Sequence, residues 1–202
     1  MLRFLAISLL MSGQLWAADA PAPFKLAAPA EWCGETIKLP PGFAPDMKLS
    51  GLEHIRFAPG MMKPASDSFF SYAFVFELEP MLALTDSVIE VEFLKYYRGL
   101  CKTVLKGKLP EVDTSEFKMT LKRDTSAAKP SPDKVTAETP TQYTATLDWV
   151  EPFATKKPQK LNLEIWTWTK NDRNYVFACV SPQAMNSPIW QQLRTIRADF
   201  LK

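Results

Sequence analysis

The chain contains a single histidine, His54, and this limits the chemistry that the protein can perform. A mechanism that needs two imidazoles, or a metal site built from several of them, is excluded. No serine or cysteine lies in a nucleophile-elbow pattern, the seven glycines form no phosphate-binding loop, and no cysteine pair has zinc or redox spacing. Alternation within the expected strand 52–57 places His54 on the face of Leu52 and Arg56, so we expect a partly exposed structural histidine. The sequence indicates no catalytic residue, no metal ligand and no cofactor.

Acidic side chains are the other candidates for catalysis. Carboxylates occur at scattered positions along the chain, at Glu35, Glu53, Asp67, Glu77 and Asp148. A hydrolase that uses carboxylic acids needs two of them on opposite sides of the bond that is cleaved. Sequence spacing does not bring any two of these residues together. A hydrolase-type enzyme that uses carboxylates or His54 in a cleft is therefore the alternative hypothesis.

Two tryptophans, Trp166 and Trp168, are the only candidates for ligand binding that the sequence offers. In the segment 161–165 the apolar residues alternate with Asn162 and Glu164, and both tryptophans share the parity of these polar residues. One interpretation is a stacking platform for a sugar ring or an aromatic ligand. The other is a sheet whose two faces are both covered by helices, so that both need large side chains. We favour the second interpretation.

Three cysteines, Cys33, Cys101 and Cys179, allow one disulfide bond. Cys33 lies in an N-terminal stretch that needs an anchor, and Cys179 lies in an apolar strand and is expected to be a small core residue. We therefore predict a Cys33–Cys101 disulfide. Pairing of Cys33 with Cys179 and three free thiols are the open alternatives.

The N-terminus has the features of a secretory signal. One positive charge, Arg3, precedes an apolar run at 4–11, and small residues follow. We predict a signal peptide at 1–17 with cleavage after Ala17, and a flexible tether rich in Ala and Pro at 18–31. The remaining residues, 32–202, have a length that suits one domain. The protein is therefore expected to be periplasmic or extracellular in a bacterium.

The order of secondary-structure elements predicts an α+β domain. Strands are expected at 36–39, 52–57, 71–78, 117–121 and 143–149, and a β-hairpin at 161–180. A long helix is expected to begin at Thr85 or Asp86 and to end near Gly107, and a short one follows Ser187. Residues 124–140 form a polar loop. Because helices do not alternate with strands, we expect a mainly antiparallel sheet packed by one long central helix and one C-terminal helix.

This order of elements is similar to that of the PsbP/Mog1-type α/β/α sandwich. The segment Leu39-Pro40-Pro41-Gly42-Phe43 stands near the start, and residues 189–200 form the closing helix. The resemblance implies helices on both sides of the sheet. It does not imply an activity, because one fold carries many functions.

The leading hypothesis is an exported soluble protein that acts as a non-enzymatic binding domain or envelope-associated accessory domain. The formal net charge is only +2, so the chain has no overall attraction for nucleic acid, and no apolar run after the signal is long enough to span a membrane. Its partner is expected to be an envelope component or a small ligand. A deep polar pocket with His54 or two facing carboxylates would instead favour the hydrolase.

Overall fold

The computed structural model describes residues 26–80, 83–106, 108, 112–125 and 140–201. The predicted signal peptide, the first part of the predicted tether and most of the predicted loop at 124–140 lie outside these residues. The end of the tether is described, and Leu26 is fully buried there. Its carbonyl oxygen accepts a hydrogen bond from Arg56 Nε at 2.8 Å. Leu26 is therefore part of the core, which the composition of the segment did not indicate.

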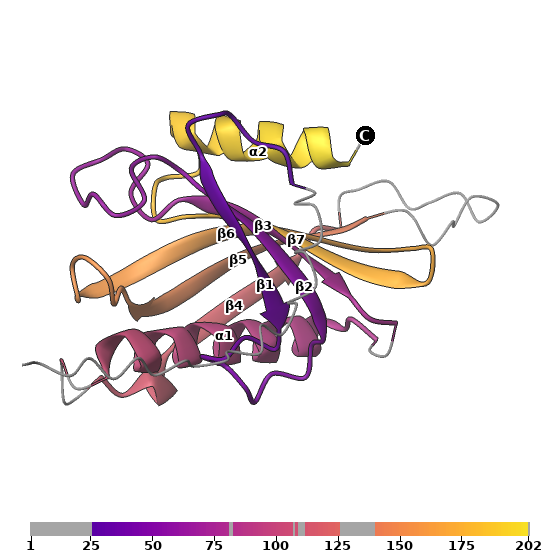
Figure 1. Cartoon of the computed structure of the whole chain (residues 1–202), viewed down its shortest axis with the longest axis horizontal. Helices are drawn as coiled ribbons and strands as arrows, with labels where there is room; N and C mark the ends of the chain where they lie inside the picture. The colour runs from indigo at the N-terminus through magenta and orange to yellow at the C-terminus, as the bar shows by residue number, and fades with distance from the viewer. Residues whose placement is uncertain (1–25, 81–82, 107, 109–111, 126–139, 202) are drawn as a thin grey trace, which may run out of the picture.

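Seven antiparallel strands form one sheet within the described residues (Figure 1). They are β1 (Cys33–Leu39), β2 (Gly51–Phe57), β3 (Tyr72–Leu78), β4 (Lys118–Arg123), β5 (Thr141–Val150), β6 (Pro158–Lys170) and β7 (Arg173–Ser181). Their order in space is β1-β2-β3-β7-β6-β5-β4, so β1 and β4 are the two edges. This sheet confirms the predicted fold class.

The predicted hairpin is formed by β6 and β7. Asn171 and Asp172 connect the strands, with positive φ angles of 51° and 58°. Two successive left-handed residues make the tight turn that matches the twist of the flanking strands, and Asn and Asp tolerate this conformation better than most residues. These two residues are therefore the turn of the hairpin that was predicted at 161–180.

Two helices lie on opposite faces of the sheet (Figure 1). Helix α1 (Asp86–Leu105) begins after Thr85, whose Oγ1 accepts a hydrogen bond from the Val88 amide at 3.3 Å. Helix α2 (Pro188–Phe200) begins after Ser187, with proline in its first turn. Both starts agree with the sequence-based prediction. A short 3₁₀ turn, η1 (Thr114–Glu116), connects α1 to β4.

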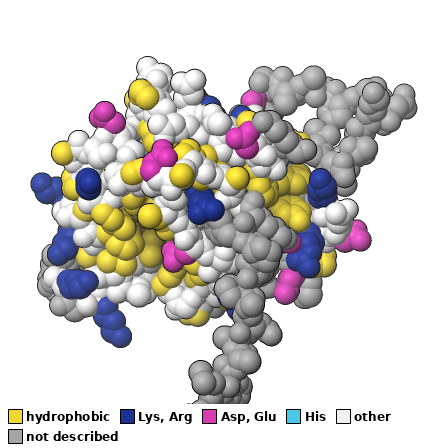
Figure 2. All heavy atoms as spheres, turned by 45° about the horizontal axis from the view of Figure 1, so that its top comes forward, with side chains coloured by type: hydrophobic (Ala, Val, Ile, Leu, Met, Phe, Trp, Pro, Cys, Tyr) yellow, Lys and Arg dark blue, Asp and Glu magenta, His cyan; other side chains and the backbone are white. Residues whose placement is uncertain are grey.

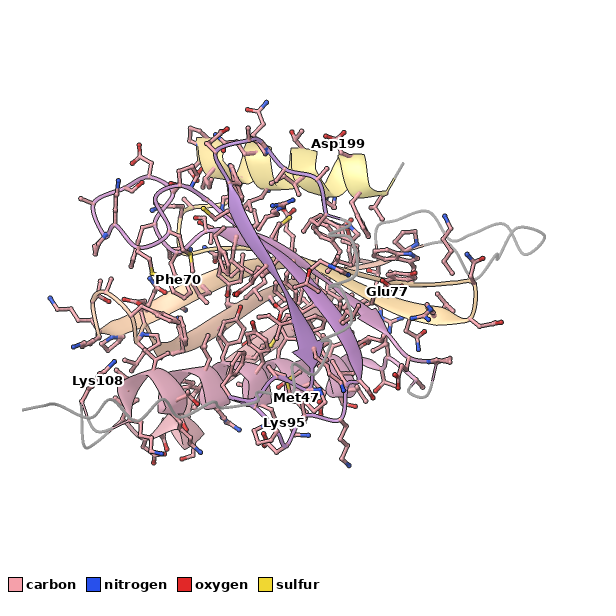
Figure 3. All side chains as sticks on the ribbon, in the orientation of Figure 1. Met47, Phe70, Glu77, Lys95, Lys108 and Asp199 are labelled. Carbon is pink, nitrogen blue, oxygen red and sulfur yellow. The ribbon has the colours of Figure 1, made fainter. Side chains whose placement is uncertain are left out.

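Each face of the sheet carries its own hydrophobic core, and side chains fill both spaces between sheet and helix (Figure 3). Every residue of β3 is buried, because alternate residues of this central strand point towards different helices. Phe74 and Phe76 contact Phe93 of α1, whereas Val75 belongs to the core under α2. Burial of each large apolar side chain contributes about 1.5–3 kcal/mol. Because each face of the sheet has its own core, the strands carry apolar residues on both faces.

Trp166 lies in the core under α2 and is 5% exposed. The Arg197 guanidinium lies over its ring at 4.1 Å from the centroid, and Arg194 Nη2 donates to Glu164 Oε1 at 2.6 Å. The change of apolar parity after Ile165 is thus explained by helix coverage, the interpretation favoured from the sequence.

Candidate functional site

An apolar pocket of about 290 Å³ lies between the β1 edge of the sheet and α1. Six parts of the chain contribute to it, namely β1 with β2, the segment after β1, the loop before β3, β3 itself, α1 and the turn after β5. Its lining is mostly aliphatic and aromatic: Ile37, Phe43, Ile55, Phe57, Met61, Met62, Phe70, Leu100 and Phe153, with Tyr72, Tyr96 and Glu35 as the polar members. A concave, mainly apolar site with few polar groups is typical of small-molecule binding.

Strand alternation decides which residues face this pocket. In β1, Glu35 and Ile37 point to the α1 side, and their partners in β2 are Ile55 and Glu53. Because β1 is an edge strand, these side chains are covered less completely than those of the central strands. Edge position and helix α1 together leave a hollow beneath β1.

The opposite wall depends on a close approach between α1 and the segment after β1. A Cβ atom on Gly99 would lie only 2.2 Å from the carbonyl oxygen of Phe43. The absence of a side chain at Gly99 therefore lets this segment rest on the helix. Phe43 then packs edge-on against Tyr96, with ring centroids 4.9 Å apart and an interplanar angle of 88°. This aromatic pair forms part of the pocket wall.

Two methionines, Met61 and Met62, line the pocket. Met61 is buried, whereas Met62 is 53% exposed, the largest value among the exposed large hydrophobic residues described. Both lie on the loop that leads to Phe70, which is labelled in Figure 3. Unbranched thioether side chains adjust to ligands of different shape. The wall that this loop supplies can therefore accommodate an entering group.

A buried carboxyl group lies behind this lining. Glu53 is fully buried, and Tyr96 Oη donates hydrogen bonds to its Oε1 at 3.1 Å and its Oε2 at 3.2 Å. Burial raises the pKa of Glu53 to about 8, the hydrogen bond from Tyr96 opposes this, and the charge of Glu35 adds to it. The carboxyl group is therefore mainly protonated and neutral at pH 7.

A second pair of polar groups lies beside Glu53. Tyr72 and Tyr97 share a hydrogen bond between their hydroxyl groups at 2.5 Å, and both rings are buried. Burial raises the pKa values of Tyr72, Tyr96 and Tyr97, so all three are neutral hydroxyl groups. The three tyrosine hydroxyl groups are therefore uncharged at pH 7, and the Glu53 carboxyl group is mainly uncharged.

His54 does not lie at this pocket, and the expected partial exposure was wrong. Its ring is fully buried on the α2 side, next to Val75 in the neighbouring strand. Nδ1 lies 3.2 Å from Thr36 Oγ1, and Nε2 lies 3.8 Å from Glu77 Oε2. The sequence-based assignment failed because this face of the sheet carries its own hydrophobic core, to which Leu26, Trp32 and α2 contribute.

The predicted Cys33–Cys101 disulfide is not formed in this structure, in which all three cysteines are free. Cys33 is exposed and is the first residue of β1. Cys101 is a residue of α1, and its side chain is fully buried in the core between this helix and the sheet. Cys179 is buried on the other face, and its thiol donates to the Leu193 carbonyl oxygen at 3.4 Å. Helix periodicity places Cys101 towards the core and away from an exposed partner.

Of the two predicted ligand-binding residues, only Trp168 reaches the surface. It is partly buried and stacks on Tyr175 at 5.2 Å between centroids with an interplanar angle of 8°. Trp166 is covered by Arg197, so its ring is not available as a platform in this arrangement. Ligand binding at Trp168 stays a prediction.

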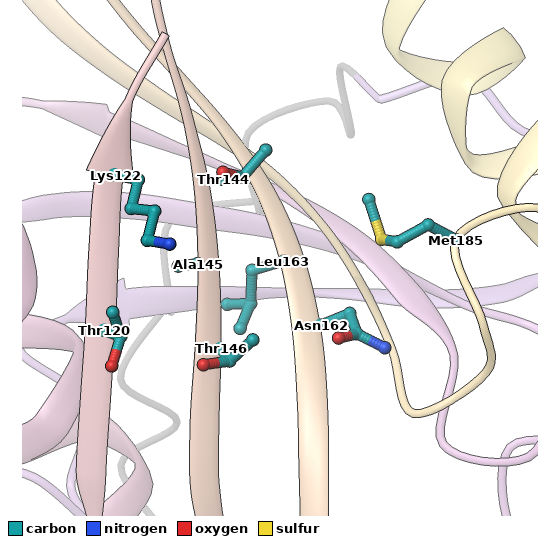
Figure 4. A pocket seen from close by; sticks show the side chains of 8 residues that line it. All are labelled: Thr120, Lys122, Thr144, Ala145, Thr146, Asn162, Leu163 and Met185. Atoms are coloured by element: carbon teal, nitrogen blue, oxygen red, sulfur yellow. The ribbon is translucent and has the colours of Figure 1, made fainter.

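A second hollow, of about 250 Å³, lies on the α2 side over β4, β5 and β6 (Figure 4). Thr120, Lys122, Thr144 and Asn162 extend into it from neighbouring strands, and Met185 approaches from the segment before α2 (Figure 4). The threonines at 120 and 144 are exposed, and the Asn162 amide already donates to the Gln183 carbonyl oxygen at 3.0 Å. This hollow has the character of a solvated sheet face.

The surface seen from the α2 side mixes charges of both signs with patches of hydrophobic side chains (Figure 2). Interspersed charges give no single-sign field that would attract a polyanion. In the part of the chain that the structure describes, no group of three or more His, Cys, Asp and Glu side chains is placed to hold a metal ion. Among those same residues, neither helix has the length and apolar composition needed to cross a bilayer.

The sequence named Glu53 only as one of five scattered carboxylates, and it did not single out Tyr96 or the apolar lining around them. One signal was present: Glu53 shares its strand parity with Ile55 and Phe57, so an acid stands among apolar residues. Nothing in the sequence showed that α1 would place Tyr96 against it. Comparison with protein-family models, curated proteins and solved structures finds no match for this chain.

Proposed function

We propose that the protein is an exported binding domain that holds the apolar part of a small ligand in the pocket between β1 and α1. The observation that carries this proposal is the lining, in which nine of twelve residues are aliphatic, thioether or phenyl side chains. Its volume of about 290 Å³ is close to the lower end of the range for ligand pockets. The flexible Met61 and Met62 support a role in binding. Export and a periplasmic or extracellular location form part of the proposal.

A neutral fluorescent probe such as N-phenyl-1-naphthylamine tests the site. The wild-type domain is expected to increase the emission of the probe in a saturable titration. Leu100→Trp, which fills the pocket from α1, should weaken binding at least tenfold. Val91→Trp is the matched control, because Val91 is on the same helix, 48% exposed, and absent from the pocket lining.

A second blocking variant, Ile37→Trp, protects the test against a folding defect in Leu100→Trp. Ile37 is half-buried on the edge strand and enters the pocket from the opposite side. Circular dichroism and the unfolding midpoint establish that each variant is folded. Equal probe binding by the wild type and by two folded blocking variants would contradict the proposed site.

One observation favours the alternative, a hydrolase. Burial raises the pKa of Glu53 to about 8, which suits a general acid, and the Glu35 side chain lies on the same face of the neighbouring strand. Against it, Glu53 is fully buried and held by Tyr96, so no substrate reaches its oxygens in this structure. Hydrolysis of nitrophenyl glycosides or esters by the wild type, lost in Glu53→Gln, would support the enzyme and overturn the binding role.

A further inference from the structure

We propose that the ligand of this pocket is a cationic amphiphile whose ammonium group lies at Glu35, with its apolar chain in the pocket. This inference rests on the proposed function, because it names the polar end of the molecule that the apolar pocket holds. It deepens the assignment from an apolar group to a chemical class of ligand.

The first argument is the placement of charge around the pocket. Glu35 is exposed and, among the lining residues that the structure describes, it is the only acidic or basic one. Within the described part of the chain, no Lys, Arg or His contributes to the lining. A carboxylate or phosphate head group would therefore meet a like charge, and a neutral head group would gain no ion pair. An ammonium group would form a charge-assisted hydrogen bond with Glu35.

The second argument is the position of Glu35 relative to Glu53. Glu35 pairs with Ile55 and Glu53 pairs with Ile37, so the two acids are diagonal neighbours on one face of β1 and β2. Diagonal residues in an antiparallel pair lie about 7–8 Å apart. A cation at the mouth of the pocket would therefore experience both carboxyl groups. Glu35 in the pocket lining and Glu53 buried behind that lining, on neighbouring strands, make an arrangement suited to an amine.

Proton release should accompany the binding of such a cation. The groups that face Glu53 are Tyr96, whose hydroxyl donates to it, the neutral Tyr72 and Tyr97, and Glu35 from β1. The neighbouring ammonium would favour the ionised form of Glu53 and lower its pKa from about 8. The complex then holds fewer protons than the free protein. The affinity for an ammonium ligand should accordingly rise as the pH increases towards 8 and level off above it.

Competition for the fluorescent probe tests the ligand class with three molecules of equal chain length: decylamine, decanol and decanoate. At pH 7 decylamine is expected to displace the probe at a concentration at least tenfold lower than the other two. Glu35→Gln should bring decylamine to within about threefold of decanol. Glu31→Gln is the matched control, because Glu31 is exposed and does not line the pocket.

The outcomes separate the inference from the function on which it rests. Equal or stronger displacement by decanol or decanoate would overturn the ammonium assignment and leave the apolar pocket in place. If no molecule of the series displaces the probe or binds by calorimetry, the proposed function fails as well. Between pH 6 and 8, the decylamine affinity should rise in the wild type and stay flat in Glu53→Gln, and a flat wild-type profile would contradict proton release.

Discussion

At the scale of single residues, Glu53 carries the most distinctive chemistry in the structure. It is an acid that is fully buried beside an apolar pocket and bound by one tyrosine. Its raised pKa means that the folded state binds a proton more tightly than the unfolded state, where the pKa is near 4.5. Stability must then fall as the pH rises from about 4.5 to about 8, because the unfolded chain releases this proton first.

Glu53→Gln provides the test of this pH dependence. Between pH 5 and pH 9 the wild type should lose roughly 3–5 kcal/mol of unfolding free energy relative to the variant. The quantity to compare is the slope of the unfolding free energy against pH, measured by urea unfolding. The buried amide of the variant changes its unfolding free energy by the same amount at every pH, so it does not affect this slope. Parallel slopes for the two proteins would show that Glu53 is ionised in the folded state at neutral pH.

The cysteines make a second prediction at this scale. Cys33 is exposed, whereas burial raises the pKa of the Cys101 thiol to about 11 and that of Cys179 still further. A thiol reagent should modify one cysteine rapidly in the folded protein and all three in denaturant, because only an accessible thiolate reacts. Cys33→Ser should remove the rapid phase. A single reactive thiol in denaturant would instead reveal a disulfide.

For single residues, the sequence predicted the structure only where a residue pattern has one structural explanation. The predicted hairpin turns at Asn171 and Asp172, and Asn and Asp adopt positive φ angles more readily than most residues. His54 was placed on the right strand but with the wrong exposure, because its cover comes from residues distant in sequence. Glu53 and Tyr96 are separated by 43 residues, and only the packing of α1 brings them together.

At the scale of elements, the β6–β7 hairpin determines how the two faces of the sheet are filled. Trp166 points to α2, and Trp168 lies nearer the surface against Tyr175 and Phe200. The alternation of residues predicted the strands, and the break in alternation correctly indicated two covered faces. The sequence could not show which helix covers Trp166, since both helices have apolar sides.

Substitution of the two tryptophans measures this difference in burial. Trp166→Ala should cost about 3–5 kcal/mol of unfolding free energy, because it removes a large side chain from a packed core. Trp168→Ala should cost about 1–2 kcal/mol, from lost aromatic contacts with its neighbours. Denaturant unfolding of both variants gives the comparison. A loss below about 0.5 kcal/mol for Trp166→Ala would place that ring at the surface.

At the scale of the whole molecule, the fold is a sheet between two helices, as the order of elements predicted. The pocket arises at the β1 edge, where the layer of α1 is completed by loops and not by a further strand. Loop geometry has no periodic signal, which is why the hollow could not be predicted although its aromatic residues were visible in the sequence.

Export is the prediction that concerns the chain as a whole. Expression in a bacterial host with an intact N-terminus should yield a processed protein in the periplasm or medium, with Ala18 as its first residue. N-terminal sequencing or mass spectrometry of the purified protein provides the measurement. Full-length protein retained in the cytoplasm would contradict the signal peptide at 1–17.

The central claim is that the pocket between β1 and α1 binds an apolar group. Methyl NMR of the methionines tests it most directly, because Met61 and Met62 line this pocket whereas Met185 lines the hollow on the opposite face. Titration with decylamine should shift the Met61 and Met62 methyl signals in a saturable manner and leave Met185 unchanged. Shifts at Met185 without shifts at Met61 and Met62 would contradict the claim.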